Sequence, residues 1–507
     1  MNRLALFVSL IALSANSGIA LAELSLASPF TDNAVLQRDR PVPIWGTSAP
    51  EATVTVQFAR QTKTAVADSE GHWKVTLDPM PASQDPRDLS VTYAHDKQSH
   101  KITNVLVGEV WICSGQSNMQ FAATSCPDIK ELIPKARRIR SFAVKRTVAF
   151  EEQTTLEGEW IESHPNSAVA FSFAYFLEKQ TDVPVGIILT CWGSSSLEAW
   201  MPRDMVNTVP HFRTLMQEFD RDNETQERIQ SILSGRKPWS REDDIFLRRQ
   251  SNLLYNAMMH PLAPYGCRGL VWYQGERNTQ SMDGMLKEPW YSRNSGMLKY
   301  GDTLKQWIRR YRQDWRNEEM EFLIVMLPGF FKALPTGPQL GPEHPATHSW
   351  AWMRESQLKA SELPNTNVVN TIDLGDVNNI HPKDKLPIGK RLALLATRNT
   401  LVSKGEAEGP SFKQMERKGD RIVIHFRNAV GLQTSDGQEP AGFWLAGPSR
   451  RWLAAEASIR GESVTLHAQK LFEPLHVRYA FAGKPKVNLI NQAGLPAVPF
   501  RTDSFSP

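Results

Sequence analysis

Two residues of this chain have the side-chain types of a nucleophile and its general base. Ser117 follows an apolar run in the segment Ser114-Gly115-Gln116-Ser117. Such a turn can expose a hydroxyl and aim the serine's own backbone N–H at an oxyanion. His381 lies in a second polar segment, and an imidazole with an ordinary pKa of about 6.5 suits proton transfer at neutral pH. A serine can instead cap a helix, and a lone histidine is more often structural, so neither residue decides the chemistry alone.

Two further polar segments could supply hydrogen-bond donors to the same reaction. Gly193 follows a second apolar run, and a glycine lets the backbone approach a ligand closely. Gln274 follows a third. A buried amide is costly unless it has a partner, so Gln274 is a candidate donor to a developing negative charge. An ordinary turn and a structural hydrogen bond explain these two positions about equally well.

The pattern between these segments predicts that they meet in space. From residue 108 to about 404, short apolar runs alternate with amphipathic segments, as in a parallel sheet covered by helices on both faces. Ligands of such a sheet bind beyond the carboxyl ends of its strands. We therefore expect nucleophile, donors and base to share one edge, as acyl transfer requires. The predicted strands are 110–113, 185–190, 270–273, 322–327 and 367–372.

The regions on either side of this α/β domain have a different pattern. Residues 23–107 and 405–507 contain short runs in which apolar and polar residues alternate, so we predict a small β domain in each. A chain of 507 residues also favours more than one domain. Residues from about 202 to 249 are polar with scattered apolar positions, and we predict a helical insertion that covers the sheet beside the substrate.

The first 22 residues predict a cleaved secretion signal. Arg3 gives a positive start, residues 4–13 are almost entirely apolar, and Ala20-Leu21-Ala22 offers small residues at a cleavage site. The apolar stretch is much shorter than the roughly 20 residues that cross a membrane. We expect a secreted or periplasmic protein without a membrane span. In an oxidising compartment its four cysteines permit one disulfide: Cys113, Cys126, Cys191 and Cys267.

Composition and charge exclude some classes of function. Hydrophobic residues make up 41% and charged residues 22% of the chain, which fits neither a disordered chain nor a membrane bundle. The net charge of +4 comes without a dense run of Lys and Arg, so we expect no nucleic-acid partner. The cysteine spacing is unlike that of a zinc site, and we expect no metal and no organic cofactor. The sequence does not predict an oligomeric state.

In combination, the four polar segments resemble the four blocks of the SGNH hydrolases, and they are most similar to the sialate O-acetylesterase family. The matching segments are 108–119, Trp192-Gly193 with Glu198-Ala199-Trp200, 272–276 and 373–382. Similar segments at 31–37 and 494–502 extend the resemblance over nearly all of the mature chain. The resemblance implies a flavodoxin-like three-layer α/β/α SGNH-hydrolase domain with a parallel five-stranded sheet and flanking small β domains.

The same resemblance implies a role for each residue. Ser117 attacks an acetyl carbonyl, and His381 moves the proton. The N–H groups of Ser117 and Gly193, with the side chain of Gln274, hold the oxyanion. An acetyl-enzyme forms and is hydrolysed by water. We also expect the substrate to contact Gln116, Trp192 and Arg277.

Two positions depart from the family pattern. Many SGNH enzymes carry an aspartate three residues before the catalytic histidine, and here that position is Asn378. The residue that orients the imidazole is then Glu276, Asp376 or none. We prefer Glu276, because related acetyl esterases recruit the glutamate of this run. Arg277 replaces a residue that is usually small, and it either binds a substrate carboxylate, such as that of sialic acid, or forms a surface ion pair.

Together these features predict a secreted serine esterase that removes O-acetyl groups from sugars, with sialate 9-O-acetylesterase as our preferred hypothesis. An acetyl esterase of plant polysaccharide, such as xylan or pectin, is an alternative because the same four segments would serve it. A non-catalytic carbohydrate-binding protein is an alternative of a different class, suggested by the flanking β domains and by tryptophans.

Overall fold

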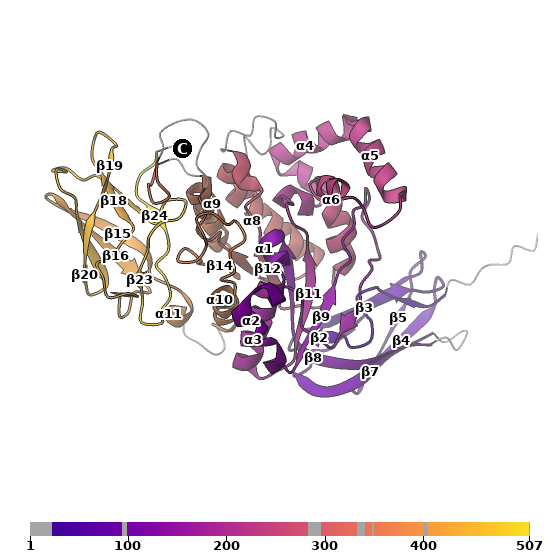
Figure 1. The fold of residues 1–507 in the computed structure, drawn as a ribbon. Helices are drawn as coiled ribbons and strands as arrows, with labels where there is room; N and C mark the ends of the chain where they lie inside the picture. The colour runs from indigo at the N-terminus through magenta and orange to yellow at the C-terminus, as the bar shows by residue number, and fades with distance from the viewer. Residues whose placement is uncertain are drawn as a thin grey trace, which may run out of the picture.

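A mixed sheet with helices on both faces forms the centre of the chain (Figure 1). The computed structural model describes residues 23–93, 99–281, 296–331, 340–346, 349–398 and 404–505. The predicted secretion signal, residues 1–22, lies outside these ranges. None of the helices in the described part of the chain has the length and apolar character of a membrane span.

All five predicted strands of the central domain are present and pair in parallel. They follow the order β11, β8, β12, β13, β14 across the sheet. Their bounds are β8 (Ser99–Gly115), β11 (Val185–Cys191), β12 (Gly269–Tyr273), β13 (Glu321–Val325) and β14 (Thr366–Val369). The predicted α/β class is therefore confirmed.

The sheet is larger than the predicted five strands. A further strand, β9 (Ile139–Ala143), pairs in parallel with β11, and the short β10 (Trp160–Ile161) pairs with β9 in antiparallel fashion. The sequence hides β9 because Arg140 and Ser141 interrupt its apolar run. Arg140 is nevertheless buried, since its guanidinium donates to the carbonyl oxygen of Asn33 and to Asn104 Oδ1.

Helices cover the two faces of the sheet. Trp111 of β8 packs edge-on against Phe173 of α3 (Ala168–Thr181), whereas Trp272 of β12 packs against Trp307 of α8 (Gly296–Asp314). Trp272 is in register with Ser114, whose side chain points to the face opposite that of Trp111. The two helices therefore lie on opposite faces. Helix α10 (Leu386–Thr397) packs beside α3, and α9 (Ser349–Leu358) beside α8.

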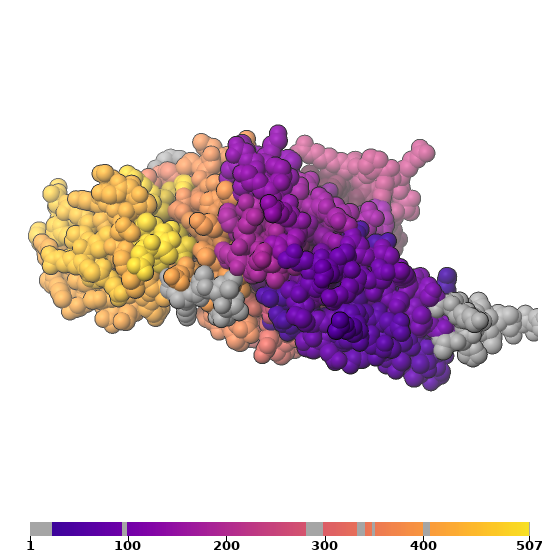
Figure 2. Space-filling model, turned by 90° about the horizontal axis from the view of Figure 1, so that it is seen from below, coloured from indigo at the N-terminus to yellow at the C-terminus, as the bar shows by residue number. Residues whose placement is uncertain are grey.

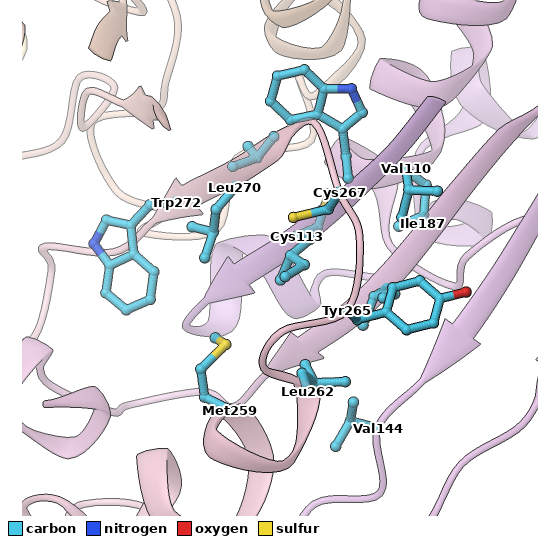
Figure 3. Close-up of a cluster of buried hydrophobic side chains, with 14 of the residues drawn as sticks. Val110, Cys113, Val144, Ile187, Met259, Leu262, Tyr265, Cys267, Leu270 and Trp272 are labelled. Carbon is cyan, nitrogen blue, oxygen red and sulfur yellow. The ribbon is translucent and has the colours of Figure 1, made fainter. Parts of the chain in front are cut away.

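The core beneath this sheet is apolar and closely packed. Figure 3 shows Val110 of β8, Ile187 of β11 and Leu270 of β12 among large side chains such as Tyr265 and Trp272. All four cysteines are buried as free thiols, so the disulfide that the sequence permits is absent. Burial raises the pKa of Cys113, which lies in this core.

The N-terminal β region is joined to the central sheet by one continuous strand. β8 pairs with β7 (Ser83–Tyr93) through its first half and with β11 and β12 through its second half, so the predicted boundary at residue 107 falls inside β8. The remaining strands of this region are β1 (Ser25–Leu26), β2 (Val35–Gln37), β3 (Val42–Thr47), β4 (Thr53–Phe58), β5 (Gln61–Val66) and β6 (His72–Leu77).

The C-terminal region consists of β-strands around a hydrophobic core of its own. It lies at the end of the molecule opposite the N-terminal β region (Figure 2). One sheet contains β15 (Ser411–Lys418), β16 (Arg421–Arg427), β20 (Glu456–Arg460) and β21 (Ser463–His467). A second contains β18 (Phe443–Ala446), β19 (Trp452–Ala454), β22 (His476–Tyr479) and β24 (Phe500–Arg501), and a third contains β17 (Gln433–Thr434) and β23 (Leu489–Ile490).

The polar segment 202–249 is helical in the structure. Three α-helices of this segment lie together above one end of the central sheet (Figure 1). They are α4 (Pro210–Arg221), α5 (Asn223–Ser234) and α6 (Arg241–Leu247). Their scattered apolar residues face inward, for example Phe212 and Met216 of α4, which are buried.

Arg354 of α9 holds the C-terminal region against the central domain. Its guanidinium is 1% exposed and donates to the carbonyl oxygens of Leu327, Ala482 and Gly483. We expect Arg354→Met to lower the midpoint of thermal unfolding by about 3–5 °C, because buried carbonyls lose charged donors. Arg460→Met, the same change on an exposed residue, should leave the midpoint unchanged. Equal midpoints for the two variants would contradict this role.

Candidate active site

The predicted nucleophile and the predicted base lie in direct contact. His381 Nε2 and Ser117 Oγ are 2.8 Å apart, within hydrogen-bond distance. Ser117 begins the short helix α1 (Ser117–Gln120), immediately after β8 ends at Gly115. Gly115 has a φ of 134°, and a Cβ there would lie 2.1 Å from the carbonyl oxygen of Tyr273, so this turn requires glycine. The turn presents the hydroxyl at the carboxyl end of the strand.

The loop after β14 holds His381 in place through backbone hydrogen bonds. Asp376 Oδ1 accepts the N–H groups of Asn378 and Asn379, at 2.7 and 3.1 Å. Asn379 Oδ1 accepts the N–H of His381 at 2.9 Å. The imidazole stacks on the ring of Phe121, with centroids 6.5 Å apart. Asp376 therefore shapes the loop and does not contact the imidazole.

The surroundings of His381 favour its neutral form. Burial lowers the pKa of His381, and the positive charge of Lys385 lowers it further. A neutral imidazole can accept the hydroxyl proton of Ser117 at Nε2. The pair is thus arranged for general-base catalysis.

Glu276 lies next to this pair but does not reach the imidazole. Its carboxylate is buried, and Oε1 accepts a 2.5 Å hydrogen bond from Asn118 Nδ2. Burial raises the pKa of Glu276, and the Asn118 hydrogen bond opposes that rise. Among the residues that the structure describes, neither Glu276 nor Asp376 is hydrogen-bonded to the ring of His381. The direct contact expected of an orienting carboxylate is not formed.

Gly193 lies beside the nucleophile, as expected for an oxyanion donor. A Cβ on Gly193 would be 3.3 Å from Ser117 Cβ. Its N–H, however, donates to Gln120 Oε1 at 2.8 Å. Gly193 can therefore donate to a substrate oxygen only when the Gln120 side chain moves aside.

Gln274 is part of a buried hydrogen-bond network instead of facing an open site. Its Nε2 lies 2.9–3.1 Å from three protein oxygens: Gln116 Oε1, the Ser195 carbonyl and Asn278 Oδ1. Its Oε1 accepts from the hydroxyl of Tyr300 at 2.8 Å. Because an amide nitrogen carries two hydrogens, both are engaged within the protein.

The side-chain amide of Gln116 is held in this network through its oxygen, while its nitrogen donates no hydrogen bond within the described part of the chain. Gln116 Oε1 accepts from Gln274 Nε2 and, at 3.2 Å, from the backbone N–H of Arg277. Within the described part of the chain, its Nε2 has no hydrogen-bond acceptor. Its neighbour along the chain, the N–H of Ser117, also donates to no protein oxygen in that part. Two donors next to Ser117 are therefore free to bind a substrate.

The two other predicted substrate contacts are both buried. Trp192 is completely buried and stacks on Trp239, with ring centroids 6.2 Å apart. Arg277 is 6% exposed and lines a pocket of about 550 Å³ between α4, α5 and α6. The backbone N–H of Arg277 donates to Gln116 Oε1, so Arg277 links the lining of this pocket to the loop before Ser117. The structure thus brings Arg277, but not Trp192, to a cavity.

Sequence reasoning missed two buried residues of the site, Asn118 and Lys385. Asn118 Nδ2 contacts Glu276 Oε1 and the carbonyl oxygen of Ile380, and its Oδ1 accepts from Lys385 Nζ at 2.7 Å. Asn118 directly follows the nucleophile in a matching segment, which was a usable signal. Lysine is almost never buried unless it is paired, so its residue type gave no such signal.

Comparison with known proteins gives consistent descriptions. Residues 107–397 match the family model "Carbohydrate esterase, sialic acid-specific acetylesterase". Sialate O-acetylesterase of Rattus norvegicus is 27% identical, covering 84% of this chain and 83% of its own length. The Homo sapiens protein of that name is 25% identical, covering 87% and 84%. A solved structure, "a novel carbohydrate acetylesterase from Xanthomonas citri", is 31% identical with a TM-score of 0.77, covering 95% of this chain and 100% of that one.

Proposed function

Because this chain belongs to the carbohydrate esterase family of sialic acid-specific acetylesterases, it is a carboxylic ester hydrolase, and we propose that it removes O-acetyl groups from carbohydrates by attack of Ser117. One observation carries this mechanism: the 2.8 Å contact between Ser117 Oγ and His381 Nε2. Family membership excludes the alternative of a non-catalytic carbohydrate-binding protein.

The reaction proceeds through an acetyl-enzyme. As Ser117 Oγ bonds to the acetyl carbon, its proton passes to His381 Nε2 and the carbonyl oxygen becomes an oxyanion. The bond from the acetyl carbon to the sugar oxygen then breaks, and the proton on Nε2 passes to that oxygen. Water attacks the acetyl-enzyme, with His381 again taking a proton, and acetate leaves while Ser117 regains its hydrogen.

The oxyanion is stabilised by donors that surround the nucleophile. The N–H of Ser117 is available as it stands, and that of Gly193 becomes available when Gln120 moves. The free Nε2 of Gln116 adds a side-chain donor, while Gln274 holds the Gln116 amide in place. Preorganised donors of this kind are worth about 10²–10³-fold in kcat each.

The pH profile should show an acid limb below the usual histidine range. Only neutral His381 can accept the serine proton, and its pKa is lowered from 6.5 by burial and by Lys385. Activity should therefore be retained as the pH falls to 6.5 and be lost only at lower pH, where the ring becomes protonated. We would measure kcat/KM against pH with a small acetyl ester. An acid limb above 6.5 would contradict the neutral base.

We propose O-acetylated sialic acid as the substrate, in line with the names of the curated relatives. The basic residue Arg277 lines a pocket and, through its backbone N–H, contacts Gln116 next to Ser117, and its guanidinium suits a carboxylated sugar. The same pocket also carries three carboxylates and two further arginines, Arg228 and Arg249, so its lining is balanced in charge, which favours a second candidate, a neutral acetylated plant polysaccharide. These carboxylates are Glu218, Asp222 and Glu242.

Acetate release from the two substrate classes, measured side by side, separates these candidates. The purified protein is offered 9-O-acetylated sialic acid and acetylated xylan at matched acetyl content. Faster acetate release from the sialic acid supports our proposal. Acetate release from xylan alone would mean that the substrate is the polysaccharide. Release from neither would contradict both.

An organophosphate identifies the nucleophile independently of the substrate. Such reagents phosphorylate an activated serine, and the modified residue can be located by mass spectrometry. We expect a single modification on Ser117 that abolishes acetate release. Inactivation with the label on another serine would contradict the assignment.

We further propose that residues 1–22 are removed on secretion, that 23–107, 108–404 and 405–507 are the three domains, the first two sharing β8, and that the central domain is of the SGNH type. The strand order β11-β8-β12-β13-β14 supports a flavodoxin-like core, because these five strands, without the added parallel strand β9, follow the order 2-1-3-4-5. N-terminal sequencing of the exported protein tests the first point. A start far from Glu23 would contradict it.

A further inference from the structure

Lys385 is a buried cation within the network behind the candidate active site. It immediately precedes α10, and its side chain is completely buried. Its Nζ donates to Asn118 Oδ1 at 2.7 Å and lies 5.6 and 5.3 Å from the ring centroids of Phe121 and Tyr273. The reaction described above assigns Lys385 no part in proton transfer or in oxyanion binding. A buried ammonium is costly, so its position needs an explanation.

Asn118 connects Lys385 to both halves of the site. Its Nδ2 donates to Glu276 Oε1 at 2.5 Å and to the Ile380 carbonyl at 3.0 Å. Asn118 directly follows Ser117, and Ile380 directly precedes His381. These hydrogen bonds therefore tie the backbone next to the nucleophile to the backbone next to the base.

We propose that Lys385 is a positioning residue: its ammonium fixes the amide of Asn118, which in turn holds the His381 loop against the helix that begins at Ser117. This inference rests on the proposed roles of Ser117 and His381. It explains how the contact between them is kept without a carboxylate on the imidazole.

The chemistry of the ammonium explains why a lysine suits this task. An amide can turn over and exchange its oxygen and nitrogen, but an ammonium only donates. Lys385 therefore selects the orientation in which Asn118 Oδ1 faces Nζ. Nδ2 must then face Glu276 and the Ile380 carbonyl, both of which only accept. A neutral apolar side chain at this position would leave Asn118 Oδ1 without its ammonium donor, so the amide would be held only from its Nδ2 side.

Two carboxylates compensate the charge of Lys385. The negative charges of Glu276 and Asp384 raise the pKa of Lys385, and each has a buried oxygen, Oε2 and Oδ1 respectively, without a hydrogen-bond partner in the described part of the chain. The cation thus balances carboxylates that would otherwise be unpaired. Burial still dominates and lowers the pKa of Lys385 to about 8.

The charge of Lys385 also acts on His381, and it gives the proposal a distinctive readout. The charged or titratable groups around Lys385 are His381, Glu276, Asp384, Cys126 and Tyr273. Removing the ammonium removes a charge that opposes protonation of the imidazole and leaves Glu276 uncompensated. Loss of that opposing charge raises the pKa of His381, so the acid limb of kcat/KM should move to higher pH.

The test compares Lys385→Met, Lys385→Arg and Asn118→Ala with Lys383→Met as matched control. Lys383 is exposed two residues earlier, so its replacement is the same chemical change without the network. We expect Lys385→Met to lower kcat about 10–100-fold with little change in KM, as for loss of an outer positioning contact. Its acid limb should shift upward. Lys385→Arg should recover the acid limb and part of kcat.

Asn118→Ala separates positioning from charge. It should lower kcat while leaving the acid limb at the parental pH, because the ammonium remains. If Lys385→Met does not fold, Asn118→Ala still tests whether the Asn118 amide positions the His381 loop. Parental kcat in Lys385→Met or in Asn118→Ala would overturn the inference. Equal losses of kcat in Lys385→Met and Lys385→Arg, with the acid limb of both variants at the parental pH, would also overturn it. The effect would then come from packing alone and not from the ammonium.

Failure of the proposed function is distinguishable from failure of this inference. Acetate release by the parent protein and organophosphate labelling of Ser117 test the function, without any change at Lys385. Normal labelling and release in the parent, together with an unaffected Lys385→Met, would leave the esterase proposal standing and remove only the role of Lys385.

Discussion

Replacing Ser117 with alanine should lower kcat for acetate release by at least about 10⁴-fold, because loss of a catalytic serine in enzymes of this kind costs that much or more. The change removes one oxygen atom, the one that lies 2.8 Å from His381 Nε2. The backbone N–H groups around the site stay in place, so substrate binding should be little changed. The measurement is steady-state acetate release by the variant, with circular dichroism to establish that it is folded.

Ser114→Ala is the matched control for this variant. Ser114 lies near the end of the same strand, and its buried Oγ has no hydrogen-bond partner in the described part of the chain. Its removal should change kcat by less than about twofold, because no hydrogen bond is lost. If Ser117→Ala kept more than a few per cent of parental kcat, another group would be the nucleophile.

The sequence predicted the catalytic sheet because its strands are buried on both faces. Runs such as 270–273 and 322–327 are continuously apolar, and each forms a strand at that place, β12 and β13. β9 could not be recognised by the same rule, because Arg140 lies within it. Its burial depends on acceptors at Asn33 and Asn104, which are distant in sequence. Periodicity carries no information on such partners.

The position of the boundary inside β8 shows a second limit of sequence patterns. Residues 99–104 of β8 are exposed or half-buried except for Ile102, whereas residues 105–115 are all buried. The pattern therefore changes near Val105 although the strand does not end. The change in the burial pattern marks the region in which β8 changes its pairing partners, from β7 to β11 and β12, and not the end of the strand.

The candidate site was predictable to the extent that it depends on strand ends. Ser117 and His381 each follow a strand of the sheet, so topology alone brought them to one edge. The partners of polar side chains were not predictable in this way. Gln274 was expected to face the oxyanion, yet its amide lies on Gln116, Ser195 and Asn278. Which of several nearby oxygens an amide meets depends on packing that a single sequence does not reveal.

Replacing His381 with alanine should lower kcat by about 10⁴–10⁶-fold, since a base and its nucleophile act as a unit. Without the imidazole, no group accepts the Ser117 proton as Oγ attacks, and none returns it to the sugar oxygen. The acid limb of the pH profile should disappear as well, because the group that produces it is gone. The measurement is kcat against pH for acetate release by the folded variant.

The double variant Ser117→Ala, His381→Ala makes this prediction specific. If the two side chains form one proton-transfer unit, the second replacement adds almost no loss to the first. Losses that multiply would mean that the residues act independently, which would contradict the mechanism. His164→Ala serves as control, because His164 is also partly buried and packs against a phenylalanine, Phe171, outside the site. Its activity should match that of the parent, so that the loss at position 381 reflects proton transfer and not removal of an aromatic ring.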